Sequence, residues 1–170
     1  MNLYDRYVLP RLLALVMRQE LFVPFRRRIG AEARGRVLEI GIGSGLNLPF
    51  YGAGVREVIG VDPSPVLLGF ARDRAAGLKV NLAVREGAAE MLPFEDAGFD
   101  TVVTTWSLCT IGDPVAALRE ARRVLAPGGG CCSRSMGCRR MRRWRGGRTA
   151  LRRCGNMWRA AAIPTGRSIG

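Results

Sequence analysis

The stretch "VLEIGIGSGLN", residues 37–47, joins a short apolar run to three glycines in alternate positions. A short, continuous apolar run is typical of a parallel strand buried on both faces. Gly41, Gly43 and Gly45 then follow at the end of this strand. A tight turn with positive φ explains one glycine, but it explains three poorly. The loop therefore predicts a ligand that approaches the backbone closely.

Strand and helix patterns alternate on the C-terminal side of this loop. Two predicted helices each begin with a capping side chain and a proline, Ser64–Pro65 and Asp113–Pro114. The first is expected to run to Gly77 and the second to the "APGGG" stop. The predicted strands are residues 36–40, 57–61, 79–84 and 99–106. This alternation predicts an α/β fold with a doubly wound parallel sheet and right-handed crossovers.

In such a sheet the ligand lies beyond the carboxyl ends of the strands. A phosphate-binding loop ending in G-K-[S/T] is excluded, because the only lysine of the chain is Lys79. A dinucleotide fingerprint, G-x-G-x-x-G, requires its third glycine where Leu46 stands. Glu39, two residues before the first glycine, would face a pyrophosphate unfavourably but would suit an ammonium group.

Asp62 ends the second predicted strand, 19 residues after Gly43. An acidic side chain at this place can accept hydrogen bonds from two ribose hydroxyls. The alternative is a turn-forming aspartate before Pro63. Together with Glu39 and the glycines, Asp62 favours a ligand with a cationic amino end and a ribose, and without phosphate.

The run "LEIGIGSG … GVDPSP … GAAEMLPFEDAGFDTVVTTWSLCTI … ALREARRVLAPGGG" resembles the class I S-adenosylmethionine-dependent methyltransferases, and most closely the type 11 group related to ubiquinone and menaquinone methylases. The segment "TTWSLCTI" is also similar to the small methyltransferase-like 7 proteins. The resemblance covers residues 35–130. It implies a Rossmann-like fold with helices on both faces, S-adenosyl-L-methionine as cofactor, and a small-molecule methyl acceptor of the quinone-precursor, lipid or thiol class.

The resemblance also implies where each part of the cofactor binds. The methionine end would meet Glu39 and the glycine loop, the ribose would meet the second strand end, the adenine edge would follow the third strand, and the methyl donor would border the fourth. Many relatives carry an acidic residue where this chain has alanine at position 88, which leaves adenine recognition to backbone groups and neighbours such as Met91. The expected cofactor-binding residues are Glu39, Gly41, Gly43, Gly45, Asp62, Pro63, Gly87, Ala88, Ala89 and Thr105.

No catalytic residue can be named from the sequence. Methyl transfer depends mainly on positioning donor and acceptor, so the lack of histidine does not exclude it. Tyr4 and Tyr7 are candidates for covering the cofactor or contacting the acceptor, with simple packing as the alternative. Cys109 is expected to be a buried apolar residue rather than a nucleophile.

Residues 1–34 are expected to form a helical N-terminal segment. Leu12, Leu13, Val16 and Met17 recur at helical spacing, and a second short helix ends near "RRRIG". Packing on the domain is the preferred interpretation. A substrate lid or a membrane-surface face is the alternative, since residues 26–28 are three arginines.

The N-terminus resembles neither a secretory signal nor a membrane span. We therefore expect a cytoplasmic protein, and we also consider a peripheral association with a membrane surface.

Residues 131–170 differ from the rest of the chain. They hold 11 of the 27 basic residues and no acid, although the family sheet requires a fifth apolar strand here. We expect a tail that is non-native or disordered, produced by a frameshift near residue 130, which would leave the sheet incomplete; an inactive, truncated methyltransferase is one alternative. Another alternative is an RNA- or anionic-surface-binding extension in which Trp144 and Trp158 stack on bases.

The spacing of the cysteines matches no usual zinc site, so we expect no bound metal. The main domain is close to neutral, which argues against nucleic acid as a partner.

Overall fold

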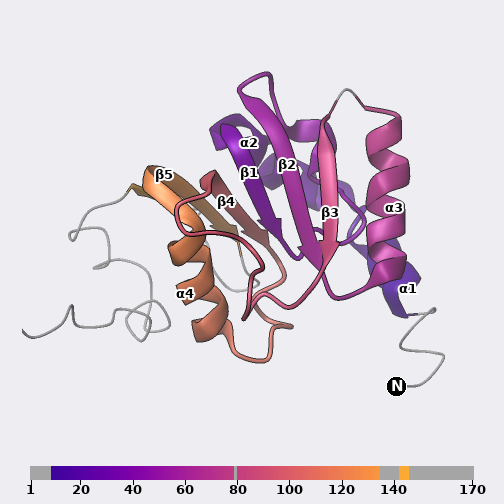
Figure 1. Cartoon of the computed structure of the whole chain (residues 1–170). Helices are drawn as coiled ribbons and strands as arrows, with labels where there is room; N and C mark the ends of the chain where they lie inside the picture. Colours follow the sequence, from indigo (N-terminus) through magenta and orange to yellow (C-terminus); the bar gives the residue numbers. More distant parts are fainter. Residues whose placement is uncertain (1–8, 79, 135–141, 146–170) are drawn as a thin grey trace, which may run out of the picture.

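A computed structural model describes residues 9–78, 80–134 and 142–145. Its central feature is a sheet in the order β3-β2-β1-β4-β5-β6, in which all neighbours are parallel except the antiparallel pair β5–β6. Figure 1 labels β1 to β5 of this sheet. The strands are β1 (Gly35–Ile40), β2 (Val55–Asp62), β3 (Leu82–Glu86), β4 (Phe99–Thr105), β5 (Leu125–Arg134) and β6 (Arg142–Arg145).

The first strand lies in the middle of the sheet and has two parallel neighbours. Leu38 is in register with Ile59 of β2 on one side and with Val102 of β4 on the other. The chain therefore builds outward from β1 through β2 to β3 and then returns to the other side of β1. This is the doubly wound order, and it confirms the predicted fold class.

The two predicted capped helices form as the sequence indicates. They are α3 (Pro65–Ala76) and α4 (Pro114–Val124). The Asp113 carboxylate accepts hydrogen bonds from the backbone N–H groups of Val115 and Ala116, at 3.0 and 2.9 Å. The Ser64 hydroxyl accepts from the N–H of Leu67 at a longer 3.4 Å. Each side chain satisfies helix N–H groups that have no partner within the helix.

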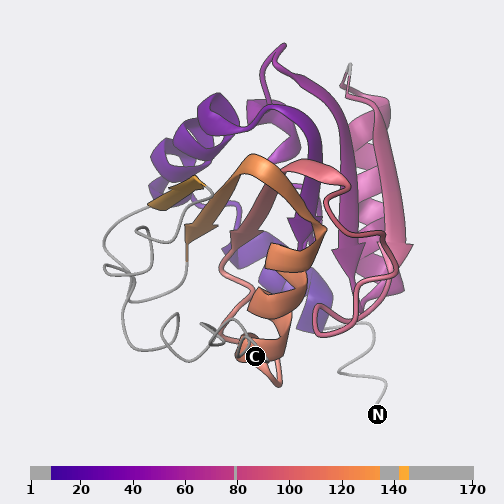
Figure 2. The same ribbon diagram turned by 60° about the vertical axis from the view of Figure 1, so that its left-hand side comes forward.

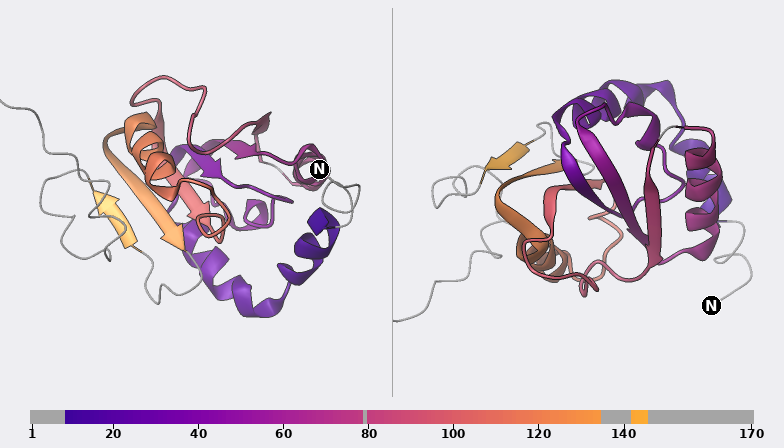
Figure 3. Two further views of the ribbon diagram at one scale, coloured as in Figure 1. Left: turned by 90° about the horizontal axis from the view of Figure 1, so that it is seen from below. Right: turned by 45° about the horizontal axis from the view of Figure 1, so that its top comes forward.

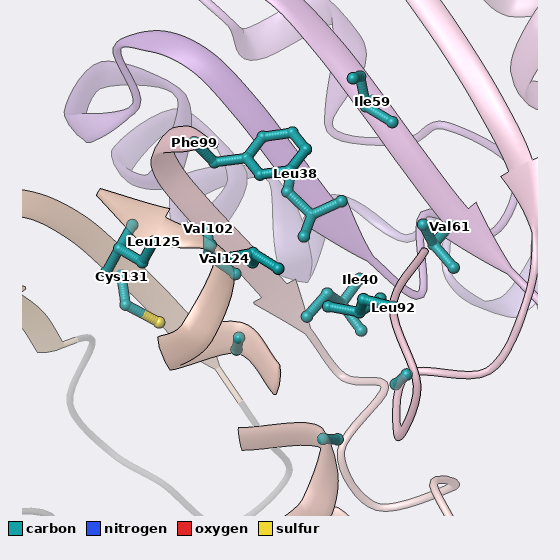
Figure 4. Close-up of a cluster of buried hydrophobic side chains, with 13 residues drawn as sticks. Leu38, Ile40, Ile59, Val61, Leu92, Phe99, Val102, Val124, Leu125 and Cys131 are labelled. Carbon is teal, nitrogen blue, oxygen red and sulfur yellow. The ribbon is translucent and has the colours of Figure 1, made fainter. Parts of the chain in front are cut away.

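Two apolar clusters cover the two faces of the sheet, because successive side chains of a strand point to opposite faces. Leu38, Ile40 and Val102 pack with α4 in one cluster, which Figure 4 shows. Val37 and Val103 pack on the other face with residues of α2 and α3. Viewed from below, α4 lies on one side of the sheet and the N-terminal helices lie on the other (Figure 3). Helices therefore cover both faces, as predicted.

The N-terminal segment contains α1 (Leu9–Val16), a 3₁₀ turn (η2, Glu20–Phe22) and α2 (Val23–Glu32), drawn in indigo to purple in Figure 2. The three consecutive arginines of α2 do not form one exposed cationic cluster. Arg26 is buried, whereas Arg27 and Arg28 are exposed, because Arg26 shares the inward face of α2 with Ile29 and Gly30. This face of α2, with Arg26, Ile29 and Gly30, is therefore buried in the domain.

The fifth strand continues past the predicted domain boundary. Residues 131–134 belong to β5 and pair with β4, and β6 pairs with β5 in turn. The sheet thus includes two stretches of the segment that we expected to lie outside the fold. The remainder of that segment, with Trp158 and Cys154, lies outside the described residues, and the division at residue 130 stays a prediction.

Candidate functional site

Four strand ends place the predicted site residues at one edge of the sheet, the lower edge in Figure 1. The glycine loop follows β1, Asp62 is the last residue of β2, Gly87 follows β3, and Thr105 ends β4. Because these strands are parallel, their carboxyl ends lie together. The topology therefore brings together segments as far apart in the chain as Gly41 and Thr105, which are separated by 64 positions.

All three loop glycines have positive φ, with 69° at Gly41, 55° at Gly43 and 71° at Gly45. Turn geometry thus requires each of them, which corrects the expectation that a turn explains only one. A Cβ at Gly41 would overlap the side chain of Ser107, and one at Gly45 would press on Leu48 and α3. A Cβ at Gly43 would meet no atom within 4 Å. Gly43 is therefore the glycine that presents bare backbone to open space.

Asp62 holds this loop in place. One carboxylate oxygen accepts a hydrogen bond from the Gly43 N–H at 3.0 Å, and the other accepts from the Ser64 N–H at 2.9 Å. The side chain is only 7% exposed, and burial raises its pKa, against the effect of these two hydrogen bonds. The turn-forming role weighed for Asp62 is thus present. Each oxygen keeps a lone pair for a further donor.

Glu39 lies beneath the loop, on the face of the sheet that α2 covers, and is 1% exposed. Oε1 accepts from the Asn47 amide at 2.6 Å, and Oε2 accepts from the Tyr51 hydroxyl at 2.7 Å. Burial raises the pKa of Glu39 to about 7, while these two hydrogen bonds and the charge of Arg26 act in the opposite direction. A cation brought to this carboxyl would favour its ionised form.

The remaining predicted residues line the neighbouring strand ends. The Gly87 N–H donates to the carbonyl oxygen of Asp62 at 3.3 Å. Ala88 is exposed and Ala89 is buried, while Met91 is 80% exposed beside them. Thr105 is buried, and its hydroxyl accepts from the Asn47 amide at 2.9 Å. Pro63 is exposed.

Sequence reasoning missed several residues of this site. Asn47 and Tyr51 are polar residues in an otherwise apolar loop, "GLNLPFY". This contrast is the sequence feature that could have identified them as site residues. Arg26 carried no comparable signal, because it stands among other arginines. Cys109 is exposed rather than buried, and its thiol lies 3.3 Å from the Trp106 carbonyl oxygen, so that prediction is wrong.

Several residues of other predictions belong to parts of the chain that the structure does not describe. Tyr4, Tyr7 and the tail cysteines Cys138 and Cys154 lie outside the described residues. Among the described residues, no group of three or more His, Cys, Asp or Glu side chains could hold a metal ion.

The family described as "Methyltransferase domain" matches residues 38–133, which include the second half of β1, the glycine loop and most of β5. The chain belongs to this family. This confirms the resemblance, and S-adenosyl-L-methionine is the cofactor that family and fold imply.

The curated relatives include proteins that are named as methyltransferases. A phosphatidylethanolamine N-methyltransferase of Cereibacter sphaeroides is 38% identical over 61% of this chain and 53% of its own. The human thiol S-methyltransferase TMT1B is 36% identical over 66% of this chain and 47% of its own. A demethylmenaquinone methyltransferase of Deinococcus radiodurans is 35% identical over 62% and 46%. The chain thus spans about half the length of these relatives.

Solved structures share the fold. The YcgJ protein of Bacillus subtilis superposes with a TM-score of 0.60 at 30% identity, over 68% of this chain and 50% of its own. A SAM-dependent methyltransferase of Thermotoga maritima gives 0.54 at 28% identity, over 77% and 60%. These similarities confirm the Rossmann-like architecture derived from strand order.

The collision at Gly41 gives a specific prediction. Gly41→Ala places a methyl group against Ser107 and adds the strain of a positive φ, so we expect it to lower the free energy of unfolding by about 2–3 kcal/mol. Ser107→Gly should recover part of this loss, because it removes the colliding atoms. Urea denaturation of both single variants and the double variant measures the coupling. Strictly additive losses would show that Ser107 is not the obstacle.

The raised pKa of Glu39 predicts a pH-dependent stability. The folded pKa of about 7 exceeds the unfolded value of 4.5, so the folded protein binds more protons between these values. The free energy of unfolding should therefore fall as pH rises, by about 2 kcal/mol from this group between pH 5 and 8. Glu39→Gln should remove that dependence, whereas Glu95→Gln, at an exposed position, should retain it. Urea denaturation of these proteins at pH 5 and pH 8 measures the dependence. If the free energy of unfolding of Glu39→Gln depends on pH as in the parent chain, the dependence does not come from Glu39.

Proposed function

We propose that this chain binds S-adenosyl-L-methionine at the glycine-loop edge and transfers its methyl group to a small-molecule acceptor of the lipid, quinone-precursor or thiol class. The observation that carries the proposal is the pairing of two buried carboxyl groups, Glu39 and Asp62, with the bare backbone of Gly43. This set offers acceptors to an ammonium group and to hydroxyls. It offers no lysine to a phosphate.

The residues present fit the cofactor. Glu39 supplies a buried acid that a cationic amino group would ionise, and Asp62 keeps acceptor capacity beyond its two backbone hydrogen bonds. The open space at Gly43 admits a ligand against the backbone. The bound cofactor supplies an activated methyl group on a sulfonium centre.

The chain's own contribution is positioning and desolvation. Glu39, Asn47 and Thr105 are all buried and joined by hydrogen bonds, so their orientation is fixed before any ligand arrives. Preorganised groups in a low-dielectric site act more strongly than the same groups in water. The described site holds no histidine, and we assign no general base.

The acceptor class rests on the names of the relatives and on the exposed N-terminal helix. The three relatives are named for a lipid, a thiol and a quinone precursor. On α1, the side chains of Leu12, Leu15 and Val16 are exposed and share one helix face, and Leu21 is exposed shortly after it. An exposed apolar helix next to the site suits delivery of a lipophilic acceptor.

The same helix supports peripheral association with a membrane surface. α1 packs against α3 near the carboxyl ends of the strands (Figure 1), and Arg11 and Arg18 are exposed beside its apolar face. An apolar face flanked by arginines suits the interface of an anionic bilayer. No helix in the described part of the chain is long and apolar enough to cross a bilayer.

Calorimetry with S-adenosylhomocysteine tests the cofactor part. The full chain should bind, and Asp62→Asn should weaken binding about tenfold or more, because hydrogen bonds to a charged acceptor are lost. Asp73→Asn, an exposed aspartate on α3, is the matched control and should bind normally. Equal affinities of the two variants would contradict the role of Asp62.

Transfer of radiolabelled methyl groups tests the acceptor part. Phosphatidylethanolamine vesicles, demethylmenaquinone and 2-mercaptoethanol are offered in turn to the full chain. We expect labelling of one of these and none of a peptide or RNA mixture. Cofactor binding without labelling of any small molecule would refute the acceptor classes while leaving the cofactor site intact.

Sedimentation with anionic phospholipid vesicles tests the membrane part. The double variant Leu12→Gln/Leu15→Gln should lower the bound fraction severalfold, since it removes apolar area from the exposed face of α1. Met91→Gln removes an even more exposed apolar side chain elsewhere and should bind like the parent chain. Equal bound fractions for all three proteins would exclude α1 as the docking face.

A further inference from the structure

Arg26 is buried, at 5% exposure, although it lies on a surface helix. Its Nη1 donates to the amide oxygen of Asn47 at 2.7 Å, and its Nη2 donates to the carbonyl oxygen of Met17 at 3.0 Å. Its guanidinium carbon also lies 4.8 Å from the centre of the Trp106 ring. Burying a guanidinium is costly without such partners, so this geometry is specific.

The contact with Arg26 fixes the orientation of the Asn47 side chain. The amide nitrogen donates to both Glu39 and Thr105, at 2.6 and 2.9 Å, while the amide oxygen accepts from Arg26. A flipped amide would place its oxygen against the Glu39 carboxylate and its N–H groups against the guanidinium. Arg26 thus determines that donors, not an acceptor, face Glu39.

Trp106 adds a second link between the N-terminal segment and the site. Its φ is 56°, in the left-handed region that a bulky residue rarely occupies. The ring contacts Arg26 on one side and Phe22 edge-on, with 4.9 Å between the ring centres. Such strain persists only where surrounding contacts hold it. Phe22 and Arg26, both from the N-terminal segment, supply those contacts. They therefore hold the ring of Trp106, the residue that directly follows Thr105.

We propose that Arg26 is a positioning residue for the cofactor site, acting through Asn47 on Glu39. The N-terminal segment is then part of the cofactor site, because α2 must be docked for the carboxyl to be held. By linkage, whatever weakens the docking of α2 weakens cofactor binding, and cofactor binding strengthens that docking. This inference rests on the proposed function for its ligand, whereas the contact geometry stands on its own.

Binding of S-adenosylhomocysteine by variants of the full chain tests the proposal. Arg26→Gln should lower the affinity about tenfold, whereas Arg27→Gln, at an exposed position on the same helix, should leave it unchanged. In an Asn47→Ala background, Arg26→Gln should cause little further loss, because the route to Glu39 is already cut. An unchanged affinity, or the same loss in both backgrounds, overturns the proposal.

A second readout needs no cofactor. Carbon-13 NMR titration of the Glu39 carboxyl in the free protein should show a higher pKa in Arg26→Gln, because the charge of Arg26 and the Asn47 hydrogen bond both lower it. Arg27→Gln should leave that pKa where it is. An unchanged pKa in Arg26→Gln overturns the proposal even if the affinity falls.

The two readouts also separate this proposal from the proposed function. If the parent chain binds no S-adenosylhomocysteine, the proposed function fails, and the titration alone decides whether Arg26 positions Glu39. If Arg26→Gln does not fold, Arg26→Lys replaces it. Lysine keeps the charge but cannot reach Asn47 and Met17 together. We therefore expect Arg26→Lys to lower the affinity less than Arg26→Gln does, and to cause no further loss of affinity in the Asn47→Ala background. A loss that persists in the Asn47→Ala background overturns the proposal.

Discussion

The buried carboxyl group of Glu39 is the constraint on which the site depends. It lies on the central strand, with both oxygens in hydrogen bonds and almost no exposure to water. Burying such a group is unfavourable unless its partners are fixed, so the structure around it is rigid by necessity. Asn47 and Tyr51 lie on the segment after the glycine loop, and their hydrogen bonds tie that segment to the strand beneath it.

The period-2 geometry of β1 explains which elements take part. Glu39 shares its face with Val37, and that face is covered by α2 and α3 rather than by α4. Arg26 can therefore reach the Asn47–Glu39 pair from α2. The N-terminal helices are consequently joined both to the proposed cofactor site, through α2, and to the exposed apolar surface, through α1. One segment thus links the proposed acceptor route to the proposed cofactor site.

Much of the fold followed from local sequence signals. The glycine spacing, Asp62 and the two proline-initiated helices all lie where local chemistry predicts, because turn geometry and helix capping depend on adjacent residues. Arg26 could not be predicted in the same way. It lies 21 positions from Asn47, and only the packing of α2 on the sheet distinguishes it from the exposed Arg27. Cys109 was misjudged because it follows a buried strand on an exposed turn.

The number of protons released on cofactor binding tests the central claim most directly. Calorimetric titration with S-adenosylhomocysteine at pH 6, repeated in buffers of different ionisation enthalpy, gives that number. At this pH the Glu39 carboxyl is mostly protonated, since its pKa is about 7, and an ammonium group placed against it should ionise it. The account predicts release of close to one proton by the parent chain and none by Glu39→Gln. Binding without proton release in the parent chain would contradict it.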